Sequence, residues 1–131
     1  MSLQKNIEEL RELKAVAEKG GGDAAIEKQI SMGKLTARER ILALLDEDSF
    51  TEFDLFVEHE ERNFGMDKKV LPGDGVITGI GTINGNPVCI YAQDFTVMGG
   101  SLGLKHARKI TKIMDHALKM KVPCIGINDS G

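Results

Sequence analysis

Residues 88–118 hold a short apolar run, a glycine-rich turn and a long amphipathic segment, in that order. The run 88–92 has the length and composition of a strand. Beyond the turn, apolar residues recur three or four positions apart, which is the spacing of one helix face. These residues are Leu104, Ala107, Ile110, Ile113, Met114, Ala117 and Leu118. We therefore predict a strand, a turn and a helix, which together form one unit of an α/β fold.

The turn at residues 94–103 contains two adjacent glycines, Gly99 and Gly100. Their missing Cβ atoms would let a ligand approach the main chain closely. The start of the following helix adds unpaired N–H donors and the positive end of its dipole, which favour an anion. The alternative is that the glycines only permit a tight turn, and the turn taken alone leaves both interpretations open.

Strands are predicted on both sides of this unit. Residues 76–83 and 88–92 flank Asn84 and Gly85, a pair typical of hairpin turns because both residue types tolerate positive φ. Gly79 and Gly81 leave one face of the first strand without side chains, so another element should pack closely there. The run 124–127 is predicted to be a buried strand that ends in a small-residue turn at 128–131. That end is the usual ligand-binding edge of an open α/β sheet.

The first 45 residues are predicted to be helical, with two interruptions. The first helix carries an apolar stripe and stops at the glycines 20–22. The stripe consists of Leu3, Ile7, Leu10, Leu13, Val16 and Ala17. We expect this helix to be an arm packed on the outside of the fold or on a partner subunit. Asp23 is the predicted N-cap of a second helix that runs to Ile30. Thr36 and Glu39 form a capping-box pattern that begins a third helix.

The segment 50–75 shows weaker patterns. Residues 50–53 alternate as a short strand would, and residues 56–59 are predicted to be extended or irregular. Residues 63–75 are rich in turn formers, which predicts a mobile surface loop.

Three cations, Lys34, Arg38 and Arg40, cluster around the start of the third helix. They could hold phosphate groups, the arginines by bidentate pairing and the lysine as a point charge. The alternative is local salt bridging, for instance with the acidic residues 46–48 that follow the helix. Both interpretations fit the sequence.

Charge is distributed unevenly along the chain. Residues 1–64 carry 15 acidic and 9 basic side chains, whereas residues 65–131 carry 5 acidic and 8 basic ones. The basic side chains of the predicted long helix either form a solvated face or attract a phosphorylated ligand. Nucleic acid is a poor candidate partner, because the whole chain is acidic and lacks interleaved aromatic residues.

Composition argues against several other classes of protein. No run of about 18 apolar residues is present, so we expect no membrane-spanning segment. The histidines and cysteines lack metal-ligand spacing, and we predict no metal site. Cys89 and Cys124 lie in apolar runs, which indicates buried, reduced thiols in a cytoplasmic protein. Ser130 lacks the surrounding pattern of a hydrolase nucleophile, which disfavours a serine hydrolase.

Seven motifs together carry a family resemblance. They are GKLTARERI at 33–41, LLDEDSF at 44–50, FVEH at 56–59, NFGM at 63–66, PGDGVITGIG at 72–81, QDFTVMGGSLG at 93–103 and PCIGINDSG at 123–131. In this order, from about residue 28 onward, the chain resembles the carboxyltransferase subunit of biotin-dependent acyl-CoA carboxylases and decarboxylases. The resemblance is to the group of propionyl-CoA carboxylase beta and methylmalonyl-CoA decarboxylase alpha. The sequence departs from the family at Asp46-Glu47-Asp48, where aspartate, proline and glycine are usual, and we expect no effect on chemistry.

The resemblance implies an α/β fold of the crotonase type, built from ββα units, of which this chain would hold the first portion. Residues 1–35 would be a helical arm and residues 36–131 the first part of the amino-terminal carboxyltransferase domain. The implied reaction moves a carboxyl group between carboxybiotin and the α-carbon of propionyl-CoA or methylmalonyl-CoA. It would pass through a thioester enolate whose charge is held by backbone N–H groups.

The resemblance also implies site residues and partners. The acyl-CoA groove would be lined by Phe95, Thr96, Val97, Met98, Gly99 and Gly100, with phosphate contacts from Lys34, Arg38 and Arg40. Gly131 would lead into the oxyanion hole, whose donors lie beyond it in the family motif. The expected partners are an acyl-CoA substrate, a carrier subunit bearing biotin, and further copies of the subunit in a dimer or hexamer. Nucleic acid and membrane are not expected as partners.

Because the family motif continues past Gly131, we expect the 131-residue chain to bind acyl-CoA and to be inactive by itself. One alternative is a non-catalytic CoA-binding or assembly module that holds a partner through its first helix. Another is a different crotonase-type acyl-CoA enzyme, which would need a carboxylate near the α-carbon. The sequence does not separate carboxylase, decarboxylase and transcarboxylase, because one half-reaction serves all three.

Overall fold

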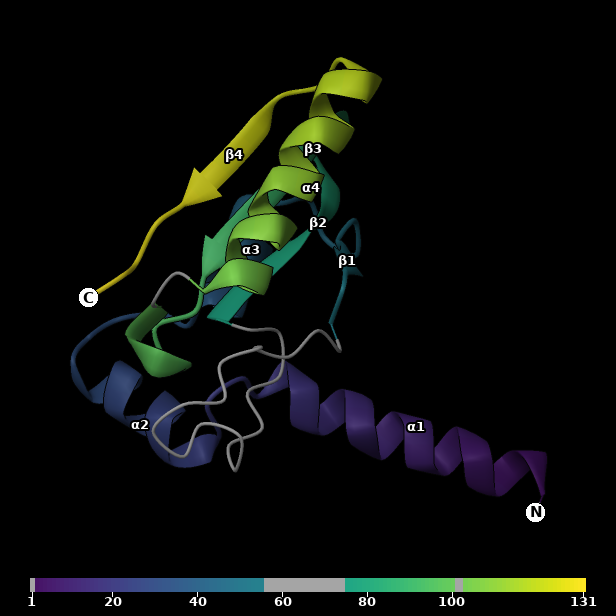
Figure 1. Cartoon of the computed structure of the whole chain (residues 1–131), viewed down its shortest axis with the longest axis vertical. Coiled ribbons are helices and arrows are strands. Elements are labelled where there is room, and N and C mark those ends of the chain that lie inside the picture. Colours follow the sequence, from purple (N-terminus) through teal and green to yellow (C-terminus); the bar gives the residue numbers. More distant parts are fainter. Residues whose placement is uncertain (1, 56–74, 101–102) are drawn as a thin grey trace.

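The computed structural model describes residues 2–55, 75–100 and 103–131 (Figure 1). In chain order its elements are α1 (Leu3–Glu18), α2 (Asp23–Ser31), α3 (Ala37–Leu44), β1 (Thr51–Phe53), β2 (Val76–Ile83), β3 (Asn86–Gln93), the 3₁₀ turn η3 (Met98–Gly100), α4 (Leu104–Met120) and β4 (Cys124–Ile127). The predicted irregular segment 56–59 lies outside the described residues, as does the predicted loop 63–75 except for Gly75.

The strands form one sheet in the order β1-β2-β3-β4. The first two pairings are antiparallel, and β3 pairs with β4 in parallel after the chain has crossed over through α4 (Figure 1). The predicted hairpin is confirmed, with Asn84 at φ 52° and Gly85 at φ 77° in its turn. These positive angles match the right-handed twist of the two strands, which explains the Asn-Gly pair.

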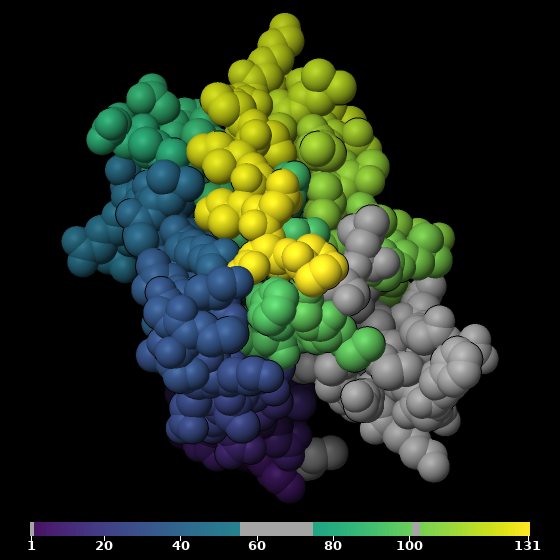
Figure 2. All heavy atoms as spheres, turned by 90° about the vertical axis from the view of Figure 1, so that its left-hand side faces the viewer, coloured from purple at the N-terminus to yellow at the C-terminus, as the bar shows by residue number. Residues whose placement is uncertain are grey.

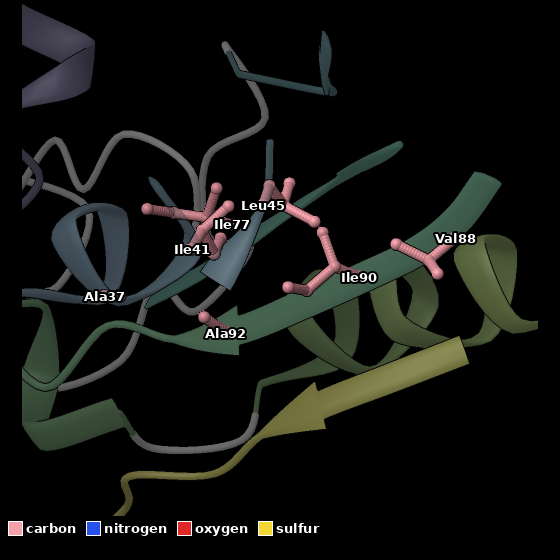
Figure 3. Packing of buried hydrophobic residues seen from close by; sticks show 7 residues of the cluster. All are labelled: Ala37, Ile41, Leu45, Ile77, Val88, Ile90 and Ala92. Carbon is pink, nitrogen blue, oxygen red and sulfur yellow. The ribbon is translucent and has the colours of Figure 1, made fainter. Parts of the chain in front are cut away.

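The sheet is covered by α3 on one face and α4 on the other. Successive side chains of a strand point to opposite faces, so β3 contributes to two apolar clusters. Val88, Ile90 and Ala92 pack against Ala37, Ile41 and Leu45 of α3 and its end (Figure 3). Cys89 packs against Ile113 and Ala117 of α4. The α3 cluster therefore fixes the helix that carries Arg38 and Arg40.

The prediction that another element packs closely over Gly79 and Gly81 is confirmed. A Cβ atom at Gly79 would overlap the Thr51 carbonyl oxygen, and one at Gly81 would meet the Leu45 side chain at 2.6 Å. These glycines let Phe50 and Thr51 on one side, and Leu45 at the end of α3, approach the backbone of β2 closely.

The strand 124–127 is not buried as predicted. Within the described residues β4 is an edge strand, and its residues alternate between exposed and half-buried. The exposed position of Cys124 follows from this, so the predicted burial is correct for Cys89 and wrong for Cys124. Both thiols are free, and burial raises the pKa of the Cys89 thiol.

Asp46 fixes the end of the hairpin far from the glycine turn. Its carboxylate accepts hydrogen bonds from Thr82 Oγ1 at 2.6 Å, Asn84 N at 2.9 Å and Gly85 N at 2.8 Å. The Thr82 hydrogen bond contributes most to holding the pKa of Asp46 below its ordinary value, followed by the two backbone N–H groups. Residues 46–48, where this sequence departs from the family, therefore lie beside the hairpin turn at Asn84 and Gly85.

The helices before the sheet follow the predicted pattern with one correction. The capping box of Thr36 and Glu39 is present, with Glu39 N donating to Thr36 Oγ1 at 3.2 Å and Thr36 N donating to Glu39 Oε2 at 2.8 Å. The N-cap of α2 is Gly22, and Asp23 is instead the first helical residue, where its charge favours the helix dipole. Helix α1 extends away from the sheet, and Ala17 is its buried residue (Figure 1).

Candidate functional site

The glycine turn and the segment after β4 lie against each other. Gly131 N donates a hydrogen bond to Gly99 O at 2.9 Å, and a Cβ atom at Gly100 would overlap the carbonyl oxygen of Asp129. In the space-filling view the carboxyl-terminal residues, in yellow, rest on the green segment that contains the turn (Figure 2). Two stretches that the sequence predicted as separate ligand-binding turns therefore form one surface.

The turn has a left-handed backbone over three successive residues. Met98, Gly99 and Gly100 have φ angles of 50°, 62° and 69°, a region that favours glycine. Gly100 N donates to Val97 O at 2.9 Å, so this N–H group is used within the turn. Gly100 is therefore required by the chain's own packing, as the tight-turn interpretation predicts, and the ligand-binding interpretation stays a prediction.

Gly99 leaves the main chain open. Among the described residues, the atoms nearest to a Cβ built there belong to the Phe95 ring, at 3.9 Å or more. The same ring lies 3.9 Å from a Cβ built at Gly131. We refer to Phe95, Gly99 and Gly131 as the glycine shelf, an area where an aromatic ring borders two backbone segments without side chains.

Thr96 and Val97 stabilise the turn through hydrogen bonds and through burial of a side chain. Thr96 N donates to Asp94 Oδ1 at 3.0 Å, and the Thr96 hydroxyl donates to the same oxygen at 2.5 Å. That hydroxyl also accepts from Gly21 N at 3.1 Å, which links the end of the α1 segment to the turn. Val97 is 2% exposed, so its side chain lies in the interior. Met98 is 47% exposed and is the outermost side chain of the turn.

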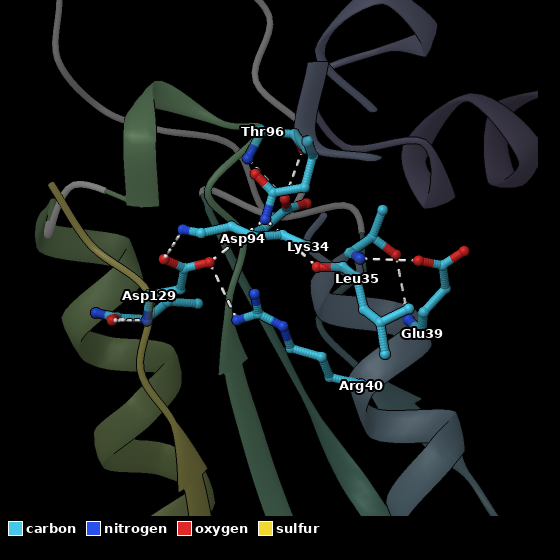
Figure 4. A network of polar contacts seen from close by, with 10 residues as sticks. Lys34, Leu35, Glu39, Arg40, Asp94, Thr96 and Asp129 are labelled. Carbon is cyan, nitrogen blue, oxygen red and sulfur yellow. Dashed lines mark hydrogen bonds and ion pairs between the residues drawn. The ribbon is translucent and has the colours of Figure 1, made fainter. Parts of the chain in front are cut away.

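A polar cluster centred on Asp129 adjoins the shelf (Figure 4). The Asp129 carboxylate accepts from Lys34 Nζ at 3.0 Å and Gln29 Nε2 at 3.4 Å, and its Oδ2 lies 3.0 Å from Arg40 NH1. Asp129 N donates to Gln93 Oε1 at 2.9 Å. Lys34 Nζ also lies 4.7 Å from the centroid of the Phe95 ring, which makes a cation–π contact.

The predicted cation cluster is thus divided between two carboxylates. Lys34 and Arg40 meet at Asp129, whereas Arg38 pairs with Glu52 of β1 at 2.7 Å. The salt bridges of the alternative interpretation are present, but their acids are not those of the turn at 46–48. Lys34 keeps the most accessible charge, with 40% of its side chain exposed.

Three members of the cluster were not singled out in the sequence: Gln29, Gln93 and Asp129. Asp129 lies in the turn predicted at the carboxyl edge of the sheet. Ligands usually bind at that edge, so its position there was the sequence feature that could have identified Asp129. The two glutamines carry no such signal, because their partners are distant in the sequence.

Acid is expected to loosen the cluster. Burial raises the pKa of Asp129 and is the largest single influence, but the Lys34 hydrogen bond, the charges of Arg40 and Lys34 and the Gln29 hydrogen bond together lower it below its ordinary value. A carboxylate with a lowered pKa in the folded state contributes stability above its unfolded pKa, near 3.8, and loses it as the pH falls through the folded value. Unfolding by urea between pH 7 and pH 2 should show this loss below about pH 4. The loss should be smaller in D129N, and an equal loss in both proteins would contradict the assignment.

The cations of α4 are used differently from one another. Lys109 is buried and donates from Nζ to Val76 O at 2.6 Å, whereas Lys112 pairs with Asp54 at 3.0 Å on the surface. A hollow of about 460 Å³ on this side is lined by Phe53, Arg108, Thr111, Lys112, Asp115, His116 and Lys119. This basic face of α4 therefore lies beside β1, where Asp54 pairs with Lys112.

Among the described residues, no three His, Cys, Asp or Glu side chains gather as a metal site would require. No helix in the described part of the chain has both the length and the apolar character needed to cross a membrane.

Comparison with known proteins gives strong matches. Residues 28–131 match the family described as the carboxyl transferase domain. The chain is 55% identical over 130 residues to methylmalonyl-CoA decarboxylase subunit alpha of Veillonella parvula, covering 99% of this chain and 26% of that relative. It is 56% identical over 125 residues to the propionyl-CoA carboxylase beta chain of Cereibacter sphaeroides, covering 95% and 24%. The chain thus spans about a quarter of the length of these curated relatives.

Solved structures agree with the sequence matches. A transcarboxylase 12S structure, described as a hexamer with methylmalonyl-coenzyme A and methylmalonic acid bound, is 48% identical and superposes with a TM-score of 0.97. The match covers 100% of this chain and 26% of that chain. A single-chain long-chain acyl-CoA carboxylase is 24% identical, with a TM-score of 0.85 over 96% of this chain and 14% of that one, and so agrees in fold.

Proposed function

The chain belongs to the carboxyl transferase domain family, with its crotonase-like fold, and from this we propose that it forms the acyl-CoA side of a biotin-dependent carboxyltransferase. The substrate would be propionyl-CoA or methylmalonyl-CoA, which agrees with the names of the relatives. Residues 36–131 would be the first part of the carboxyltransferase domain, and residues 1–35 would be a helical arm.

The glycine shelf is the observation that carries this proposal. A thioester is a planar group with a carbonyl oxygen, and it can lie close to a main chain only where side chains are absent. Gly99 and Gly131 supply such main chain, and the Phe95 ring offers an apolar border for an acyl group. We assign Phe95, Met98 and Gly99 to the groove surface, and Thr96, Val97 and the buried Gly100 to its support.

The proposed chemistry requires charge stabilisation more than catalytic side chains. Loss of a proton or of CO₂ from the α-carbon leaves the bonding electrons behind as an enolate, whose negative charge collects on the thioester oxygen. Backbone N–H groups aimed at that oxygen stabilise it, and removing one such donor typically slows a reaction about 10²- to 10³-fold. Gly131 N is bonded to Gly99 O, so its assigned role is to lead the chain toward such donors. Carboxybiotin on a carrier subunit would supply the carboxyl group in one direction, and biotin would accept it in the other.

Phosphate binding is the less direct part of the proposal. Lys34 has an accessible ammonium group beside the Phe95 ring and could contact a CoA phosphate while it holds Asp129. Arg38 and Arg40 are each 22% exposed and paired with carboxylates, and their phosphate contacts stay a prediction. We further propose a homo-oligomer, since one structural relative is described as a hexamer, and a cytoplasmic location, which the free thiols support.

The proposal is tested by hydrogen exchange of the 131-residue chain with and without propionyl-CoA. Bound thioester should slow exchange at residues 95–100, because it would cover the open main chain at Gly99. Free CoA with propionate is the matched control, since it carries the phosphates and the acid without the thioester. Unchanged exchange at 95–100 at saturating propionyl-CoA would contradict the proposed site. We expect carboxyl transfer only from a polypeptide of the relatives' length, assayed with a biotin carrier.

A further inference from the structure

We propose that Asp129 is a positioning residue for acyl-CoA binding and that Arg40 acts on the site through Asp129. The inference rests on the proposed function, because the surface that Asp129 would position is the glycine shelf. It differs from the sequence-based expectation for Arg40, in which the guanidinium group contacts a CoA phosphate directly.

The main chain of Asp129 is fixed on both sides. Its N–H donates to the Gln93 side chain at 2.9 Å, and its carbonyl oxygen lies where a Cβ atom at Gly100 would be. Two residues further on, Gly131 N donates to Gly99 O. The distance between the two backbone segments of the shelf therefore depends on where Asp129 sits.

The side chain of Asp129 is held by three elements that are remote in sequence. Gln29 comes from α2. Lys34 comes from the segment before α3 and Arg40 from α3 itself (Figure 4). Helix α3 is in turn anchored to the sheet through Ile41, which is 0% exposed. The Arg40 pair thereby ties the segment after β4 to α3 and its apolar cluster.

Because the Arg40–Asp129 ion pair is partly buried, its loss should affect the structure around it. The Asp129 side chain is 13% exposed and that of Arg40 is 22% exposed. Removing the Asp129 carboxylate takes a partner from both Arg40 and Lys34, whereas removing Arg40 leaves Asp129 paired with Lys34. Losing charge compensation in a shielded cluster costs more than losing a surface pair. Residues 129–131 would then move so that the uncompensated charge reaches solvent. The distance between the two backbone segments of the shelf would increase.

The chain contains a matched control pair two residues away on the same helix. Arg38 and Glu52 lie 2.7 Å apart with exposed fractions of 22% and 12%, close to the 22% and 13% of Arg40 and Asp129. Glu52 belongs to β1, which pairs with β2 at the edge of the sheet opposite β4. Loss of the Glu52 charge should therefore cost comparable stability without moving the shelf.

The experiment compares D129N, R40Q and E52Q by their dissociation constants for two ligands, propionyl-CoA and propionyl-pantetheine, which lacks the phosphates. Positioning predicts that D129N weakens propionyl-CoA and propionyl-pantetheine by one and the same factor, about 10-fold, which lies in the range of substitutions that act without touching the ligand. R40Q should likewise affect the two ligands equally. E52Q should weaken neither ligand by more than about 2-fold, the change expected for a charge with no contact to the site. D129E, which keeps the charge, should recover part of the affinity.

Two results would overturn the inference. An affinity loss in R40Q that appears with propionyl-CoA and is absent with propionyl-pantetheine would make Arg40 a direct phosphate ligand. Equal losses in D129N and E52Q would make the effect one of general stability.

A measurement without ligand separates this inference from the proposed function. In D129N, amide hydrogen exchange at Gly100 and Gly131 should be faster than in E52Q, because the two segments of the shelf are no longer held together. If the wild-type chain binds neither thioester, the proposed function fails, and the exchange rates still decide whether Asp129 positions the shelf. Equal exchange rates in the two variants would reject the positioning role.

Discussion

Alanine at Gly100 is expected to lower the free energy of unfolding by about 3 kcal/mol and to abolish acyl-CoA binding. Two costs combine at this position. A φ of 69° costs an L-residue about 1–2 kcal/mol, and the new methyl group would overlap the Asp129 carbonyl oxygen, an overpacking cost of about 1–3 kcal/mol. Relief of the overlap would push the segment after β4 away from the turn. Urea unfolding and titration with propionyl-CoA measure the two effects.

Gly99 supplies the control for this prediction. Its φ of 62° imposes a similar conformational cost, but the nearest atoms to a methyl group there are those of the Phe95 ring at 3.9 Å. G99A should therefore lose only about 1–2 kcal/mol. It should still bind thioester less tightly, because the methyl group would stand on the shelf. Equal losses of stability in the two variants would show that the Asp129 carbonyl does not press on the turn.

The second large effect is expected in the core beneath α3. Ile41 is 0% exposed and packs among the apolar residues of β2 and β3. Truncation to alanine removes three carbon atoms and leaves a cavity, which costs about 2–5 kcal/mol for a buried isoleucine. Because α3 carries Arg40, I41A should also weaken the hold on Asp129. Chemical denaturation would measure the stability, and hydrogen exchange at Gly131 would measure the coupling to the site.

The neighbouring residue on the same helix is the natural comparison. Leu42 is 56% exposed, so its truncation to alanine removes little buried surface and should change stability by less than about 1 kcal/mol. If L42A proved as destabilising as I41A, the outer face of α3 would be covered rather than exposed.

Much of the fold could be predicted because the local patterns agree with the tertiary structure. The Asn84-Gly85 turn, the capping box at Thr36 and the spacing of apolar residues along α4 each depend on neighbours within a few positions. Such signals are written in the sequence itself. The burial of β4 was predicted wrongly because edge and centre strands share the same apolar composition, and only the strand order separates them.

The candidate site could be predicted in part. The glycine turn and the end of β4 were both recognised, because glycine-rich turns after strands are local features. The direct contact between them, the hydrogen bond from Gly131 N to Gly99 O, is a feature of the tertiary structure that the sequence did not predict. The partners of the three cations were also out of reach, since Arg38 and Arg40 lie two residues apart yet pair with carboxylates on different strands or their ends.

The sequence by itself determined the elements of this protein, their order and the family to which its motifs belong. The tertiary structure alone decided that Gly100 is filled by the chain's own backbone while Gly99 stays open, and that Asp129 gathers Gln29, Lys34 and Arg40 beside them. The physical reason is the separation along the sequence of the residues that interact. Backbone conformation and amphipathic spacing are set by residues a few positions apart, whereas close packing and ion pairing depend on atoms brought together from about 100 positions away.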